Sequence, residues 1–335
     1  MADETIITLS PSGLDVFIGC PRKYHYRYTA NIHEPEINQK TSLQWLGPNE
    51  RGTMIHRAME LYTIACIFPL SHKLGSEDAP PGSIEEDKIV TALNTVIFEE
   101  KDFKKAWEQA VKEIEIELQK KSVEALIIPV SAKEKELSEA EVDCRNAIIY
   151  LLDKMKERHQ YPVEVEMKFG KRKDEDGKEL IVSKSGEESF AICGSIDRVD
   201  YDVITKKYIV VDYKTGKIDK KRKLREGGRD DLLQDRMYAL AFELLNPGKE
   251  VSTSRYVFPA EDNQEIVENM TASSKKIFID RLWDEVNKIR SKVDKCCKGN
   301  EAEYPDCEYT CKYCSYIELC IASDELEVLT TDVTG

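Results

Sequence analysis

The chain has 335 residues, of which 41% are hydrophobic and 33% charged, as in soluble globular proteins, and no apolar run approaches the length of a membrane span. It starts without a basic segment followed by an apolar one, so we expect a cytoplasmic protein with no membrane partner. The net charge of −14 excludes a general electrostatic grip on nucleic acid but leaves room for a local basic site.

The N-terminal segment LSPSGLDVFIGCPRKYHYRY (residues 9–28) is predicted to open with a helix. Ser10 or Ser12 is the candidate cap, Pro11 suits the first turn, and Pro21 ends the helix. The stretch RKYHYRY mixes basic and aromatic residues. Such a composition either stacks bases and holds a nucleic-acid backbone, or belongs to a helix that packs its tyrosines against a cysteine-bound metal cluster.

A second helix is predicted over RGTMIHRAMELYTIA, with Ile55, Met59 and Tyr62 on one stripe and His56 beside it. It is followed by a predicted loop at residues 75–82.

Residues 84–158 carry charged and apolar residues at helical spacing, and Pro129 divides this pattern. We interpret this part as a helical lobe inserted between the N-terminal helices and a sheet.

The pattern changes to strands near Tyr161. YPVEVEMKF alternates apolar and charged residues, so Glu164 and Glu166 are interpreted as solvated. Two further strands, a helix, another strand and a long helix follow, within SFAICGSIDRVDYD (189–202), KYIVVDYKTG (207–216), DDLLQDRMYALAFELL (230–245), STSRYVF (252–258) and residues 273–297. These elements predict an α/β fold in which helices flank a mixed sheet.

Asp197 and Asp212 lie on successive predicted strands that would pair as a hairpin. Adjacent strands are about 5 Å apart, so two carboxylates at matching heights can share one Mg²⁺ or Mn²⁺. Lys214 lies on the same face of its strand as Asp212 and could orient a water and stabilise charge on a phosphoryl oxygen. The alternative is a pair of ordinary salt bridges, Asp212 with Lys214 and Asp197 with Arg198.

Gln234 and Tyr238 are four residues apart on the following helix and therefore share a face. Taken singly, the glutamine is explained by solvation and the tyrosine by core packing. His56 is one more candidate ligand, although a lone histidine beside an apolar stripe is usually structural.

The order of GTMIH, GSIDRVD, VVDYKTGK and QDRMYALA resembles the RecB-like branch of the PD-(D/E)XK nuclease superfamily. The resemblance covers the N-terminal segment, the helix with His56, and residues 160–320, but not the helical insert. It implies a restriction-endonuclease-like core and a metal-dependent phosphodiesterase site. The site residues that it implies are His56, Asp197 and Asp212 as metal ligands, Lys214 as the catalytic amine, and Gln234 and Tyr238 beside the DNA.

Ten cysteines in a chain with no export signal point to reduced thiols or metal ligation, and six of them lie within the final 40 residues. Cys311, Cys314 and Cys320 are spaced C-x2-C-x5-C. With Cys20 they resemble the split iron–sulfur staple of AddB-like and CRISPR-associated RecB-like nucleases, which implies a [4Fe–4S] cluster that joins the two ends of the chain. Structural zinc is the competing interpretation, and Cys307 could replace Cys20 in a purely local site. Three other cysteines are interpreted as small core residues, namely Cys66, Cys144 and Cys193.

After Lys214 the run KIDKKRKLREGGR is cationic, although the chain as a whole is acidic. We interpret it as a loop that contacts DNA phosphates through Lys217, Lys220, Lys221, Arg222, Lys223 and Arg225. The alternative is a solvated loop. No Gly-rich phosphate loop of a motor is present, so any helicase activity would come from a partner subunit.

Together these features predict a Mg²⁺- or Mn²⁺-dependent deoxyribonuclease that acts as an exonuclease on single strands or DNA ends, in repair, recombination, mobile-element or CRISPR processes. The alternatives are a CRISPR spacer-processing nuclease and a non-catalytic iron–sulfur subunit of a helicase–nuclease complex. The predicted divisions are the N-terminal helices of the nuclease domain at residues 1–66, the insert at 67–160, the nuclease core and cluster segment at 161–322, and a disordered tail at 323–335.

Overall fold

In the computed structural model the described residues are 6–32, 45–68, 84–121, 130–171, 177–183, 188–216, 218, 233–259, 261, 264–297 and 314–320. The chain forms two compact units. The central unit comprises Lys40–Phe169 and Gly194–Lys275, and the terminal unit comprises Met1–Gln39, Gly170–Cys193 and Lys276–Gly335. The predicted loop at 75–82, Pro129 and the predicted tail lie outside the described residues.

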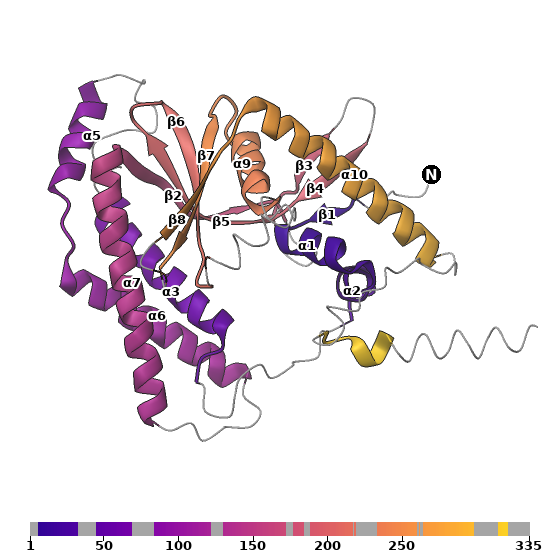
Figure 1. The fold of residues 1–335 in the computed structure, drawn as a ribbon, viewed down its shortest axis with the longest axis horizontal. Coiled ribbons are helices and arrows are strands. Elements are labelled where there is room, and N and C mark those ends of the chain that lie inside the picture. The colour runs from indigo at the N-terminus through magenta and orange to yellow at the C-terminus, as the bar shows by residue number, and fades with distance from the viewer. Residues whose placement is uncertain are drawn as a thin grey trace, which may run out of the picture. The chain divides into compact units, whose positions relative to one another are not determined.

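The central unit is built on a five-stranded mixed sheet, as the strand patterns predict (Figure 1). In spatial order its strands are β2 (Gln160–Phe169), β5 (Gly194–Asp202), β6 (Lys207–Tyr213), β7 (Val251–Phe258) and β8 (Gln264–Asn269). Only β6 and β7 pair in parallel, and the other neighbours are antiparallel. A parallel pair needs a crossover connection, and helix α9 (Leu233–Leu245) lies within the one between them.

Helices cover both faces of this sheet (Figure 1). One face packs against α3 (Pro48–Tyr62), α6 (Glu100–Lys121) and α7 (Val130–Arg158), whose buried residues form one hydrophobic cluster with Ile209, Val211 and Tyr213 of β6. The side chains that alternate with these face the other way, where Tyr208 contacts Phe242 of α9 with ring centroids 4.9 Å apart. The helices predicted over residues 84–158 therefore form α5 (Ile84–Thr95), α6 and α7, and all three contribute to the core shared with the sheet.

The terminal unit contains a small sheet of β1 (Thr8–Leu9), β4 (Ser189–Ile192) and β3 (Leu180–Ser183), in that order. Its N-terminal helices are α1 (Pro11–Gly19), α2 (Pro21–Tyr24) and a π-helical turn, η1 (His25–Thr29). The predicted Ser10 cap is confirmed, because its Oγ accepts a hydrogen bond from the backbone N–H of Gly13 at 3.0 Å.

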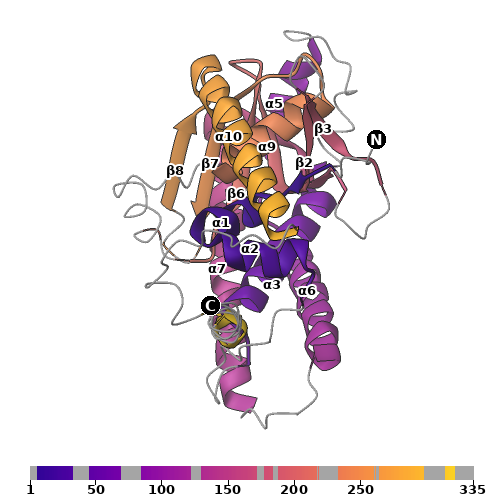
Figure 2. The ribbon, with the colours of Figure 1, turned by 90° about the vertical axis from the view of Figure 1, so that its right-hand side faces the viewer.

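The long helix α10 (Ala272–Cys297) contributes most of its length to the terminal unit, and Figure 2 shows α1 and α2 near its lower end. The Trp283 ring packs edge-on against Phe190 of β4 at 4.7 Å. The C-terminal segment also reaches the N-terminal one: the Tyr316 hydroxyl donates to the carbonyl of Ile32 at 2.9 Å, and the Tyr316 ring contacts Tyr26. The N-terminal helical segment and the C-terminal segment of the described chain are thus in contact. None of the helices within the described ranges combines the length and hydrophobicity that crossing a membrane requires.

The segment SFAICGSIDRVDYD was expected to form one strand, and this expectation is wrong. The structure divides it at Cys193 into β4 and β5, which belong to different sheets. The backbone partners explain the division: the N–H of Cys193 bonds to the carbonyl of Leu9, whereas Gly194 pairs with Phe169 of β2. A Cβ at Gly194 would lie 2.7 Å from the Phe169 ring, so glycine permits the change of partner.

Gly170 provides a test of the backbone in the terminal unit. Its φ is +64°, and a Cβ there would clash with the carbonyl oxygen of Ile192. We expect Gly170→Ala to lower the free energy of unfolding by about 1–3 kcal/mol, measured by urea denaturation. Gly19→Ala is the matched control, because a Cβ at the end of α1 meets nothing within 4 Å. A Gly170→Ala protein as stable as the control would contradict this geometry.

Candidate active site

Three neighbouring strands bring three carboxylates level with one another. In the pairing of β2 with β5, Val165 lies opposite Arg198 and Met167 opposite Ile196, so Glu166 comes between these pairs at the level of Asp197. Continuing the β5–β6 register by one residue places Asp212 opposite Asp197 on the other side. Directly opposed residues on adjacent strands have side chains about 5 Å apart. The predicted pairing of the two aspartate strands is therefore confirmed, and the row contains one acid more than expected.

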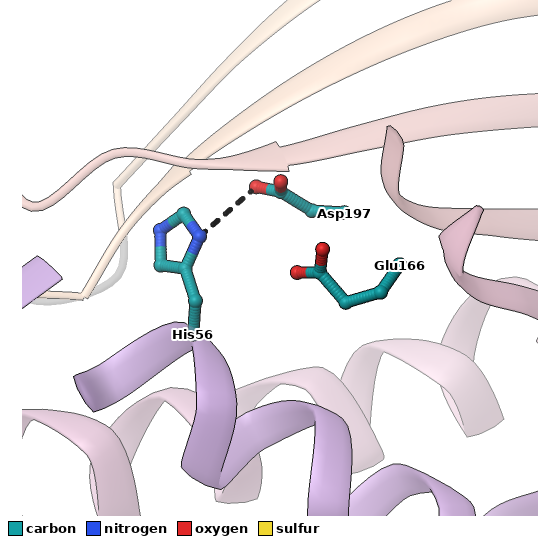
Figure 3. Close-up of side chains that lie close together, drawn as sticks. All are labelled: His56, Glu166 and Asp197. Carbon is teal, nitrogen blue, oxygen red and sulfur yellow. Dashed lines mark ion pairs between the residues drawn. The ribbon is translucent and has the colours of Figure 1, made fainter. Parts of the chain in front are cut away.

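His56 reaches this row from helix α3. Its Nδ1 lies 3.5 Å from Oδ2 of Asp197, and Figure 3 shows the two side chains facing each other. Gly52, one turn earlier, allows the helix to approach, because a Cβ there would already lie 3.0 Å from Oγ1 of Thr215. The edge of the Tyr213 ring contacts the imidazole at a centroid distance of 5.7 Å. His56 is thus held beside the carboxylates, with its side chain half-buried.

The ionisation states of His56 and Asp197 favour the binding of a cation between them. Burial lowers the pKa of His56, so the imidazole is neutral at neutral pH, the form that binds metals. Burial and then the charge of Asp212 raise the pKa of Asp197 well above its ordinary value, although the backbone N–H of Tyr213 donates to Oδ2 at 2.8 Å. A buried carboxylate with its charge uncompensated is costly unless a positive ion approaches.

Asp212 also fits a cation site. Its side chain is 6% exposed, and Oδ2 has no aligned hydrogen-bond donor within the described part of the chain, although the Lys214 ammonium lies 2.7 Å away. Burial lowers the pKa of Lys214, but the carboxylates of Asp212 and Asp197 outweigh burial and raise it above its ordinary value. The amine therefore stays protonated and positively charged at neutral pH.

Gln234 links the predicted residues of helix α9 to the carboxylate row. Its Oε1 accepts from Nζ of Lys214 at 2.9 Å, and its Nε2 donates to Oδ1 of Asp212 at 2.9 Å and to the Tyr238 hydroxyl at 2.7 Å. Tyr238 is buried, with its ring edge-on against Phe169. The helical spacing of four that singled out this pair thus places both in one hydrogen-bonded network with Lys214 and Asp212.

Of the two salt bridges considered as an alternative, one is present. Asp212 and Lys214 form an ion pair. Arg198, however, pairs with Asp200, at 2.5 Å and 3.0 Å, and both are buried on the opposite face of β5 from Asp197. The expected pairing of Asp197 with Arg198 is therefore wrong, because adjacent residues of a strand point to opposite faces.

Glu166 is the site residue that sequence reasoning missed, and its interpretation as solvated is wrong. It is half-buried, and its Oε2 accepts from the Ser195 hydroxyl at 3.1 Å. Burial, with the nearby charge of Asp197, raises its pKa to about 7. His56, Glu166 and Asp197 each offer a ligand atom, and these atoms all lie within 4.8 Å of one another. The only sequence signal for Glu166 was its position on a strand that precedes the strand of Asp197. That position indicates a site residue only once the register between the two strands is known.

The predicted cluster cysteines lie in the terminal unit. Cys20 Sγ accepts from the backbone N–H of Lys23 at 3.4 Å, and Cys320 Sγ accepts from the Arg22 guanidinium at 3.5 Å. Among the described residues, the sulfurs of Cys20, Cys314 and Cys320 do not all lie within 4.8 Å of one another. The fourth predicted ligand, Cys311, lies outside the described residues.

Of the cysteines interpreted as core residues, Cys144 and Cys193 are buried and Cys66 is half-buried. The side chains of Cys296, Cys297 and Cys307 lie outside what the structure describes.

The predicted nucleic-acid contacts are largely outside the described residues. This is so for Lys217, Lys220, Lys221, Arg222, Lys223 and Arg225. In RKYHYRY, Tyr24 and Tyr26 are buried, and Tyr24 packs between the rings of Phe17 and Tyr28. These two tyrosines are therefore packed inside the protein, and their packing against a metal cluster stays a prediction.

Comparison with known proteins agrees with this geometry. The family model of the PD-(D/E)XK nuclease superfamily matches residues 8–321, which include all of the residues predicted for the metal and lysine site. A search of the curated proteins found no match. The superfamily expected from the motif order is confirmed, and the RecB-like branch stays a prediction.

Proposed function

The chain belongs to the PD-(D/E)XK nuclease superfamily, a superfamily of metal-dependent nucleases, and from that premise we propose that it is an exonuclease acting on single strands or ends of DNA. The observation that carries the proposal is the arrangement of the predicted residues: His56 lies 3.5 Å from Asp197, and Lys214 lies 2.7 Å from Asp212 on the neighbouring strand. Carboxylates and a histidine can hold the cation of metal-assisted phosphodiester hydrolysis, and an amine can stabilise the charge that develops on the phosphate.

His56, Asp197 and Asp212 would hold one or two Mg²⁺ or Mn²⁺ ions. When bound, the cation polarises the phosphate and lowers the pKa of the attacking water. Lys214 is protonated, so it stabilises negative charge on the phosphoryl oxygens and orients the water, and does not act as a base. Gln234 holds the ammonium in place through its 2.9 Å hydrogen bond, and Tyr238 in turn fixes the amide.

The activity can be tested with linear DNA labelled at the 5′ or the 3′ end, single- or double-stranded, in Mg²⁺ or Mn²⁺ and with a chelator as control. We expect progressive release of nucleotides from one end and no cleavage with the chelator. Circular single-stranded DNA of the same sequence is the matched substrate without ends. Equal cleavage of circles would reject the exonuclease assignment, and intact DNA in every arm would reject the nuclease. Cleavage of a labelled RNA strand under the same conditions shows whether the protein prefers DNA or RNA as its substrate.

We further propose that Cys20, Cys311, Cys314 and Cys320 hold a [4Fe–4S] cluster. Two observations support this: N–H groups donate to the sulfurs of Cys20 and Cys320, as suits thiolates, and Tyr316 holds the C-terminal segment to Ile32. The cluster would fasten the two ends of the chain to each other. The biological setting that we propose is DNA repair, recombination or a CRISPR process in the cytoplasm, with a helicase as the partner that opens duplex DNA.

The cluster has a direct test in protein purified without oxygen. We expect a brown protein that contains iron, and we expect Cys320→Ser to lose the iron and to lower the melting temperature, because a ligand that closes a long loop is removed. Cys66→Ser, in the central unit, is the matched control and should keep the iron. A colourless wild-type protein that contains zinc would overturn the assignment in favour of a zinc site.

A further inference from the structure

The helical insert has no part in the proposed chemistry, yet its helices α6 and α7 lie against α3, the helix that carries His56 (Figure 1). Both arginines of α3 pair with acids of the insert: Arg51 with Asp143 of α7, and Arg57 with Glu113 of α6. The guanidinium of Arg57 donates to both oxygens of Glu113, at 2.7 Å and 3.3 Å. At about 100° per residue, Arg51 and Arg57 leave the helix on sides other than that of His56. The insert therefore holds α3 from the sides that do not face the carboxylate row.

The chain just before α3 is also held by α7. Gly47 starts the helix and has no side chain to cap it. The backbone N–H groups of Trp45 and Leu46 donate to the two carboxylate oxygens of Glu136, at 3.1 Å and 2.8 Å. One turn earlier on α7, the ammonium of Lys133 lies 4.7 Å from the centre of the Trp45 ring. Hydrogen bonds to a carboxylate are strong and directional, so Glu136 fixes where α3 begins.

The position of His56 depends on that of its helix. Its Nδ1 lies 3.5 Å from Oδ2 of Asp197, which is longer than a usual N–H···O hydrogen bond, so this contact by itself does not fix the imidazole. The apolar side of α3 packs into the core shared with α6 and α7, and burial of apolar surface is non-directional. Such packing holds α3 against the insert. The directional contacts of Glu136 and Asp143 add the restraint on its position along and about its own axis.

We propose that Glu136 and Asp143 are positioning residues for His56, and that the helical insert is the scaffold that sets the imidazole against Asp197. The inference rests on the proposed function, because His56 belongs to the proposed metal site. The partners of both acids lie on α3 or just before it, so each acid acts through that helix. A displacement of about 1 Å at a reacting centre can lower a rate by roughly 100-fold, so the loss of either contact should be felt at the site.

Cleavage of end-labelled single-stranded DNA by the full-length protein, in Mn²⁺ and below the melting temperature of every variant, tests the proposal. We expect Glu136→Ala and Asp143→Ala each to lower kcat by roughly 10-fold and to change KM by less than about 2-fold, because the contacts act on the catalytic site and not on DNA binding. Exchange of the two charges, by combining Arg51→Asp with Asp143→Arg, should restore most of the rate. Glu139→Ala is the matched control and should cleave as the wild type does, since Glu139 lies on α7 and pairs with Lys135 of the same helix.

Two further measurements distinguish positioning from a general loss of structure. In a His56→Ala background, neither Glu136→Ala nor Asp143→Ala should lower the single-turnover rate further, because their effect passes through the imidazole. Nuclear magnetic resonance of protein with ¹⁵N-labelled histidines locates the imidazole without any cleavage. We expect Glu136→Ala to shift the ring signals of His56, which are assigned by their loss in His56→Ala. The signals of His159, which follows the other end of α7, should stay unchanged.

The possible outcomes are distinct. Additive losses in the His56→Ala background, or unmoved His56 signals in Glu136→Ala, would overturn the inference. If the signals move as expected but the wild type cleaves no nucleic acid, only the proposed function fails. If the wild type cleaves DNA and both Glu136→Ala and Asp143→Ala cleave at the same rate as the wild type, only this inference fails.

Discussion

Lys214→Ala is expected to lower the rate of metal-dependent DNA cleavage by roughly 10²–10³-fold, as removal of one preorganised charge from a transition state usually does. The ammonium is 2.7 Å from Asp212 and is held by Gln234, so no neighbouring side chain of the described chain is placed to substitute for it. Because a positive charge is removed, Mn²⁺ affinity should stay the same or increase. Initial rates on end-labelled single strands, together with Mn²⁺ binding, separate the two effects.

Lys207→Ala is the matched control. Lys207 lies at the start of β6, seven residues before Lys214, and pairs with Glu250 at the protein surface. Its loss should leave the cleavage rate and the stability within experimental error, since exposed ion pairs contribute little. Equal cleavage by Lys214→Ala and the wild type would remove Lys214 from the catalytic set and with it the assignment of the site.

Asp197→Asn and Asp200→Asn should have opposite effects on stability, although the two residues lie on one strand. In the metal-free protein at neutral pH, Asp197→Asn is expected to raise the melting temperature, because burial and the charge of Asp212 disfavour the ionised Asp197. Asp200→Asn is expected to lower the free energy of unfolding by about 3–5 kcal/mol, because it leaves the buried Arg198 without its partner. Calorimetry and urea denaturation measure both.

The same two substitutions distinguish an effect on cleavage from an effect on stability. Asp197→Asn should lower cleavage by at least about 10³-fold, since a metal ligand is lost, despite its higher melting temperature. Asp200→Asn should retain cleavage at temperatures where it stays folded. A stabilised Asp197→Asn that still cleaves DNA would show that this carboxylate does not hold the catalytic cation, and a destabilised one would contradict the electrostatic account.

The pH dependence of the metal-free protein follows from the sign of the shifts. The pKa of Glu166 is raised in the folded protein to about 7, and that of Asp197 is also raised. A carboxyl group with a raised pKa contributes its stability below its unfolded pKa and loses it as the pH rises through the folded value. The lowered pKa of His56 acts in the opposite direction below about pH 6.5, so the carboxyl contribution has to be isolated. The melting temperature of the metal-free wild type should fall, relative to that of metal-free Glu166→Gln, between about pH 4.5 and pH 7. Saturating Mn²⁺ should reduce this fall, because the cation binds the ionised carboxylates.

Local sequence patterns were sufficient to predict many of the site residues. A side-chain period of two on β6 places Asp212 and Lys214 on one face, and a period of 3.6 on α9 does the same for Gln234 and Tyr238. These periods are properties of the backbone and need no knowledge of the fold. His56 required more, because its role depended on the order of the motifs along the chain.

The sequence by itself determined the superfamily, the mixed sheet with its flanking helices, and the residues whose neighbours lie within four positions along the chain. Only the tertiary structure decided that Glu166 faces Asp197, that Arg198 pairs with Asp200 on the opposite face, and that one predicted strand divides at Cys193 between two sheets. The physical reason is that strand register and sheet membership arise from contacts between residues far apart in the chain, and the alternation within a single strand carries no information about them.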